Sequence, residues 1–158
     1  MKLLRATDEA IVFSLNTTER DVLVQILDLY PLVPAAHQPL SRSLPAEPAA
    51  EARRLLDEAL AEQRAHHKAR VKTWLAGEKR FRRTKAGYTL TVRREDSEWL
   101  LQVLNDIRVG SWLLLGSPED RQEPGDVDPQ LNRIWAAMEI SGMFEMFILH
   151  GLEGRSPI

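Results

Sequence analysis

The segment WLLQVLNDIRVGSWLLLG, residues 99–116, constrains the fold more than any other part of this chain. Its apolar residues recur at helical spacing, and Leu100, Leu104 and Ile107 fall on one stripe, which predicts a helix that packs in a core. Four polar residues interrupt the segment: Gln102, Asn105, Asp106 and Arg108. Because a membrane-spanning helix needs about 20 predominantly apolar residues, this segment predicts the core of a soluble domain and no membrane association.

Arg108 falls on the stripe that should be buried, where an isolated charge would be very costly. A second long helix, predicted at 129–150, carries Glu145 near the centre of an apolar stripe. Each helix also contains an internal glycine, Gly110 or Gly142, at a position where glycine costs about 1 kcal/mol relative to alanine. We therefore predict that the two helices are antiparallel, cross at these glycines, and join Arg108 to Glu145 in a structural ion pair.

The predicted helix at 129–150 is apolar on two faces. We expect the first to pack on the core; it comprises Leu131, Ile134, Trp135, Met138, Gly142 and Leu149. The second, nearly opposite, comprises Ala137, Ile140, Met143, Phe144 and Phe147. A helix that is apolar on both sides lies centrally in a core or is shared with another chain. We expect a homodimer through this helix or the one at 49–76; alternatively, strands within residues 2–15 cover the second face.

The remaining segments predict an α+β fold that is mainly helical, with about four helices in a single domain spanning residues 1–158. Residues 2–15 and 80–93 read as short antiparallel β-hairpins, and residues 31–48 hold five prolines, as expected of a linker or arm. Asp96 or Ser97 is expected to cap the third helix, which Gly116 ends. The expected helices begin near 16–18, 49, 96 and 129 and end near Pro31, Gly77, Gly116 and His150.

Catalytic chemistry has little support in the residue pattern. The chain has no cysteine and no phosphate-binding or metalloprotease motif, so we expect no catalytic residue, cofactor or metal. The functional alternative for the polar helix residues is an acid/base or anion site, made of Asp106, Arg108, Glu145 and His150. His67 lies on an apolar helix stripe, which favours a histidine that is hydrogen-bonded in the interior or at an interface over a metal ligand.

Charge is distributed unevenly along the chain. Residues 64–94 carry eleven Lys or Arg and one acid, a net charge of +10, whereas the whole chain has −2. Such a block is typical of nucleic-acid or other anion binding, and it also fits a solvated hairpin that faces the acidic loop near 119–128. Within the predicted hairpin, only Phe81 and Tyr88 carry aromatic rings that could stack on bases. The candidate anion contacts are Lys79, Arg80, Arg82, Arg83, Lys85, Arg93 and Arg94.

A family resemblance rests on Trp99, the triplet Leu104-Asn105-Asp106, Arg108, and the closing helix WAAMEISGMFEMFILHGL. These features resemble a bacterial family known as domain of unknown function 2017. Members have no assigned activity and tend to be encoded near the adaptor of the Clp protease, which implies a loose link to regulated proteolysis. We therefore expect a cytoplasmic, non-enzymatic interaction or regulatory module. The alternative is a nucleic-acid-associated protein that binds through residues 64–94.

Overall fold

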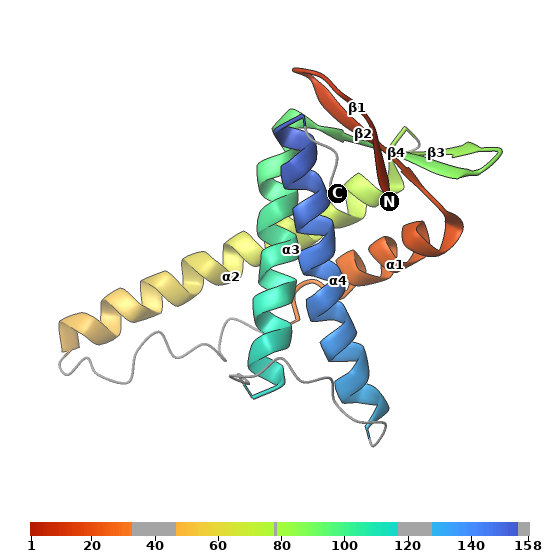
Figure 1. The fold of residues 1–158 in the computed structure, drawn as a ribbon. Helices are drawn as coiled ribbons and strands as arrows, with labels where there is room; N and C mark the ends of the chain where they lie inside the picture. The colour runs from red at the N-terminus through yellow and green to blue at the C-terminus, as the bar shows by residue number, and fades with distance from the viewer. Residues whose placement is uncertain (33–46, 78, 117–127, 155–158) are drawn as a thin grey trace.

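The computed structural model describes residues 1–32, 47–77, 79–116 and 128–154 and shows the predicted α+β, mainly helical fold (Figure 1). Residues 33–46 of the expected linker and residues 117–127 of the acidic loop lie outside the described part. The elements in chain order are β1 (Lys2–Ala6), β2 (Ala10–Leu15), α1 (Thr17–Asp28), α2 (Glu47–Ala76), β3 (Phe81–Thr84), β4 (Gly87–Arg93), α3 (Arg94–Leu114) and α4 (Pro129–Leu152).

The two expected hairpins join into one antiparallel sheet with the strand order β1-β2-β4-β3. The central pairing sets Phe13 of β2 opposite Leu90 of β4. Alternate residues of β2 are buried, as a sheet with one covered face requires. Gly87 begins β4 with a φ of +137°, and a Cβ there would lie 2.3 Å from the carbonyl oxygen of Leu15. Only glycine therefore fits this close contact between the hairpin and β2.

The sheet lies across the end of the α3–α4 pair, where α3 begins and α4 ends (Figure 1). Leu100, Leu104 and Ile107 of α3 are fully buried, as their stripe predicts. Burying each such side chain contributes about 1.5–3 kcal/mol. The other core residues that are no more than 2% exposed come from the sheet, α1 and the residue after its cap, α3 and α4: Ile11, Phe13, Leu15, Leu23, Leu27, Tyr30, Leu90, Val92, Val103, Phe144 and Ile148.

The prediction of which α4 face packs on the core was wrong. The buried residues of α4 are Ala137, Met138, Ser141, Phe144, Ile148 and Gly151. A Cβ at Gly151 would lie 2.7 Å from the Ile11 side chain, so small residues let this face approach the sheet. Leu131 and Leu149, expected in the core, are 38% and 48% exposed. Most of the second face is thus buried or partly buried within the chain, in line with the alternative to a shared face, whereas the first face is only partly covered apart from the buried Met138.

The helix ends follow their expected residues except at the start of α3. Asn16 caps α1 and forms a reciprocal capping box with Glu19. Neither Asp96 nor Ser97 caps α3, because β4 runs directly into the helix and Arg93 occupies the N-cap position. Gly116, with a φ of +84°, follows the end of α3 as predicted.

The first half of α2 projects from the rest of the described structure (Figure 1). Residues 50–66, here called the α2 arm, are about 25 Å long and nearly all exposed, including Leu55 and Leu56 at 55% and 47%. The second half of α2 packs against the body, where His67, Val71 and Trp74 are buried. The helix is therefore anchored at one end.

Candidate interaction groove between α3 and α4

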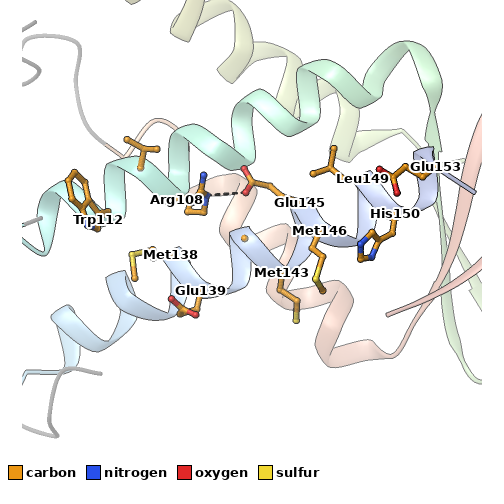
Figure 2. A pocket seen from close by; sticks show the side chains of 12 residues that line it. Arg108, Trp112, Met138, Glu139, Met143, Glu145, Met146, Leu149, His150 and Glu153 are labelled. Atoms are coloured by element: carbon orange, nitrogen blue, oxygen red, sulfur yellow. Dashed lines mark ion pairs between the residues drawn. The ribbon is translucent and has the colours of Figure 1, made fainter. Parts of the chain in front are cut away.

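The ion pair expected between α3 and α4 is present. Arg108 Nε lies 3.0 Å from Glu145 Oε2, and the two side chains are 37% and 14% exposed (Figure 2). Arg108 Nη2 also donates a 2.8 Å hydrogen bond to Asn105 Oδ1. A Cβ at Gly142 would lie 3.3 Å from Arg108 Cδ, so the glycine leaves room for the arginine to cross α4. The polar residues on this side of α3 thus bind one another and α4.

Burial and the Arg108 partner act in opposite directions on the pKa of Glu145. Burial raises the pKa of the Glu145 carboxyl, and the Arg108 guanidinium opposes that rise. Because more than a third of Arg108 remains in water, the pair lies at the edge of the core. Its net contribution to stability therefore falls between that of an exposed pair and that of a fully buried one.

The prediction that Gly110 lies at the crossing was wrong. Gly110 is two residues, or about 200°, from Arg108 around the helix, so it faces the opposite side. There it lines a small cavity of about 20 Å³ with Tyr30, Arg64 and Asp106. The Tyr30 hydroxyl donates to Asp106 Oδ2 at 3.4 Å, and burial together with this carboxylate raises the pKa of Tyr30 to about 12.

The four residues of the possible acid/base site do not converge. Arg108, Glu145 and His150 line one groove, whereas Asp106 lines the small cavity beside Tyr30. Among the described residues, no group of three or more His, Asp or Glu side chains is placed to hold a metal ion. This arrangement gives no support to acid/base catalysis by the four residues together.

His67 is interior, as expected, but not all of its hydrogen-bonding groups have a partner. The ring is 8% exposed and lies between the aromatic rings of Tyr30 and Trp99, at centroid distances of 6.2 Å and 6.5 Å. Its buried Nδ1 has no hydrogen-bond partner within the described ranges. Burial lowers the pKa of His67, so the anchored end of α2 holds a histidine that resists protonation.

A groove of about 990 Å³ runs along α3 and α4, and we call it the α3–α4 groove. Its apolar lining includes Trp112, Met143, Met146 and Leu149, which are 39%, 38%, 43% and 48% exposed (Figure 2). With Met138, three of the chain's four methionines line it. Sequence reasoning missed the groove because its lining crosses the two predicted faces of α4: Leu149 was expected in the core, Met143 against a second chain, and Met146 on neither face.

Several of the candidate basic residues are committed to structural contacts. Asp96 accepts from Arg70 Nη2 at 2.8 Å and from Arg80 Nη1 at 3.0 Å. The same two guanidiniums stack over Trp99 and Trp74, at 4.5 Å and 4.7 Å from the ring centroids. This cluster, here called the Asp96 clamp, fastens the end of α2 and the lead into β3 to the start of α3.

The other candidates divide into bound and exposed groups. Arg93 pairs with Glu95, and Arg94 donates to the carbonyl oxygens of Thr7 and Leu152. In the described parts of the chain, four candidates make no ion pair: Lys79, Arg82, Arg83 and Lys85. These four lie on or beside the outermost strand β3 and its turn. The structure thus reduces the predicted basic surface to the outer side of one hairpin.

The aromatic rings of this hairpin are already covered. The Arg20 guanidinium from α1 lies 5.5 Å from the Phe81 ring centroid and 5.4 Å from that of Tyr88. Cation–π contacts of this kind contribute about 0.5–1 kcal/mol at exposed positions. The two half-buried rings therefore hold the hairpin against α1, and Arg20 occupies part of the surface on which bases could stack.

The chain matches no family model, no curated protein and no solved structure. The resemblance to the domain of unknown function 2017 family therefore stays a prediction from the residues that carry it. No helix in the described ranges is long and apolar enough to cross a bilayer.

Proposed function

We propose that this protein is a non-enzymatic interaction module of the cytoplasm that binds a helical segment of another protein in the α3–α4 groove. The observation that carries this proposal is the exposed lining of the groove by Trp112, Met143, Met146 and Leu149. Methionines are flexible and polarisable, and they are common on surfaces that adapt to helical partners. Grouping such residues in one hollow, instead of scattering them singly, is typical of an interaction site.

The same proposal includes two further expectations. Leu55 and Leu56 of the α2 arm form, with Ala52 and Ala59, an exposed i, i+3, i+4, i+7 stripe that supports homodimerisation through α2. The family resemblance supports a loose connection to regulated proteolysis, in which an interaction module would act by bringing proteins together.

The proposed function is tested with a synthetic amphipathic helix. The probe is a fluorescent peptide with leucines at i, i+3, i+4 and i+7 and glutamines elsewhere, and binding to the full chain is followed by fluorescence anisotropy. We expect a micromolar Kd, weakened at least about tenfold by Leu149→Asp, which puts a charge in the apolar groove. Leu29→Asp changes a leucine that is equally exposed, at 48%, and lies outside both the groove and the α2 arm, so it is the matched control. Absence of binding, or equal weakening by both substitutions, would refute the proposal.

Nucleic-acid binding is the second candidate, supported by the exposed Arg82, Arg83 and Lys85 of the β3 hairpin. Phosphate contacts would give an affinity that falls steeply as salt rises. Changing these three residues together to Glu spares Arg80 and the Asp96 clamp, so the fold should persist. Anisotropy titrations with double-stranded and single-stranded DNA in low salt test this candidate, and no binding to the unmodified chain would dismiss it.

A further inference from the structure

All the sulfur atoms of this chain belong to its four methionines, because the sequence contains no cysteine. Exposure divides the methionines into two pairs. The side chain of Met1 is 1% exposed and Met138 is 5% exposed, whereas Met143 and Met146 are 38% and 43% exposed. An oxidant dissolved in water therefore reaches the second pair more readily than the first.

The exposed pair lies in the α3–α4 groove. Met143 and Met146 are three residues apart on α4, or about 4.5 Å along the helix axis, so they are neighbours on one face of the helix. Both line the groove, and Figure 2 shows their side chains extending from the same side of α4. The two thioethers thus form part of the apolar surface that the proposed function assigns to a helical partner.

Oxidation changes the chemical character of such a side chain. When hydrogen peroxide transfers one oxygen atom to the thioether sulfur, an S–O bond forms, the O–O bond breaks, and the rest of the peroxide leaves as water. The sulfur loses the two electrons that the peroxide gains. The product, methionine sulfoxide, is polar and accepts hydrogen bonds, whereas the thioether is apolar. Covering a sulfoxide with an apolar helix therefore costs the free energy of a buried polar group without a partner.

We propose that Met143 and Met146 are a reversible oxidation site, at which peroxide closes the α3–α4 groove to its helical partner. This inference rests on the proposed function and adds its regulation. The reverse step is the reaction of methionine sulfoxide reductases. They remove the oxygen as water while a pair of thiols is oxidised to a disulfide, and the apolar thioether is restored.

The fold should persist through this change. The core contacts of α4 are made by other residues, among them Phe144 and Ile148, which are 1% and 2% exposed. Met143 and Met146 already face water, so their sulfoxides stay hydrated in the free protein, and the cost arises only when a partner covers them. Oxidation should therefore act on binding and leave the stability of the chain largely unchanged.

The first test locates the oxidation. The full chain is treated with hydrogen peroxide, and each methionine is followed over time by peptide mass spectrometry. We expect Met143 and Met146 to be oxidised at least about tenfold faster than Met1 and Met138, as their exposure requires. Saturation with the neutral amphipathic helix should slow oxidation of the exposed pair, because the helix covers both side chains. Equal rates at all four methionines, or no protection by the bound helix, would overturn the proposal.

The second test measures binding of the same probe by fluorescence anisotropy. Oxidation should raise the Kd at least about fivefold, and the two reductases that act on the two sulfoxide epimers, supplied with a dithiol, should restore it. The double variant Met143→Leu, Met146→Leu keeps the groove apolar and removes both reactive sulfurs. It should bind like the unchanged chain and no longer respond to peroxide.

A polar substitution reproduces the effect without an oxidant. Met146→Gln places a polar side chain of similar length in the groove and should weaken binding. Leu29→Gln makes a comparable change at a residue that is 48% exposed and lies outside the groove, so it should leave binding unchanged. Equal binding by the two variants would count against the proposal, because polarity at Met146 would then be tolerated.

The outcomes separate this inference from the proposed function. Unchanged binding by a chain that is oxidised at both residues, or a peroxide response that persists in the leucine variant, overturns the oxidation site and leaves the interaction module standing. Loss of binding together with unfolding in circular dichroism also overturns it, because oxidation would then damage the fold. No binding of the probe before oxidation refutes the proposed function and the oxidation site with it.

Discussion

Individual polar residues in this chain serve mainly to join elements. Arg108 bridges α3 and α4, and Asp96 holds two arginines that precede it in the chain. The two carboxylates differ from an exposed one such as Glu95, because Asp96 is 11% and Glu145 14% exposed, whereas Glu95 is 67% exposed. At the residue scale, burial therefore decides which charges matter for stability.

Replacing Asp96 by Ala should destabilise the protein by about 2–3 kcal/mol, because two guanidiniums lose their shared acceptor in a partly buried place. Glu95→Ala removes a carboxylate from the same turn of α3, in an exposed pair with Arg93, and should cost no more than about 0.5 kcal/mol. Urea unfolding of both variants measures the difference. Equal costs would show that the Asp96 clamp does not fasten α2 to α3.

Protonation of His67 should oppose folding. Burial lowers its pKa in the folded chain, so the unfolded chain binds the proton more readily. The free energy of unfolding should therefore decrease as pH falls below about 6.5, the ordinary value for histidine. Unfolding curves at several values between pH 7.5 and 5 should show a weaker decrease in His67→Gln than in the unchanged chain.

The comparison with His67→Gln is needed to isolate the effect of His67, because burial also raises the pKa values of Asp106 and Glu145. Those two carboxyls bind protons more tightly in the folded chain, and they favour folding as the medium becomes acidic. The effect of Glu145 is common to both proteins and cancels in the difference, whereas the His67–Asp106 interaction is part of what the substitution removes. Parallel pH profiles for His67→Gln and the unchanged chain would contradict the prediction for His67.

At the scale of elements, local sequence patterns were sufficient to predict the helices and strands, but not how each element packs against the others. The helical stripe of Leu100, Leu104 and Ile107 predicted the buried face of α3, and charge cost predicted the pairing of Arg108. Both faces of α4 are apolar, so periodicity could not decide which one meets the sheet. The start of α3 was predicted wrongly because aspartate is a common N-cap residue. Only the fold shows that Asp96 instead binds two arginines.

The α2 arm should be the least protected long helix in the described structure. Most helical stability in proteins comes from packing against other elements, and the arm lacks the packing that His67, Val71 and Trp74 give to the rest of α2. Hydrogen exchange at low micromolar concentration should be rapid in residues 50–62 and slow in residues 67–76. Strong protection of the arm that does not depend on protein concentration would contradict this expectation.

At the scale of the whole molecule, the sequence did not predict that the two hairpins join into one sheet. Pairing of β2 with β4 spans more than 70 residues of chain, and no local pattern specifies it. That pairing brings Ile11 and Phe13 against Gly151 and so decides the orientation of α4. The exposed α3–α4 groove follows directly, because Met143, Met146 and Leu149 of α4 then remain exposed.

The homodimer prediction belongs to the same scale. If the leucine stripe of the α2 arm pairs with its copy, light scattering at micromolar concentration should give twice the chain mass of 18.0 kDa. Changing Leu55 and Leu56 together to Asp should return the protein to a monomer without loss of the fold. A monomeric unchanged chain would contradict the prediction and leave the arm as a single exposed helix.

The central claim, that the α3–α4 groove is an interaction surface, is tested most directly by methyl NMR of the chain labelled at its methionines. Three of the four methyl groups report on the groove, and Met1, which packs at the edge of the core, is an internal control. Addition of the neutral amphipathic helix should shift the resonances of Met143 and Met146 and leave that of Met1 unchanged. Unchanged resonances at saturating peptide, or a shift common to all four methyl groups, would contradict the account.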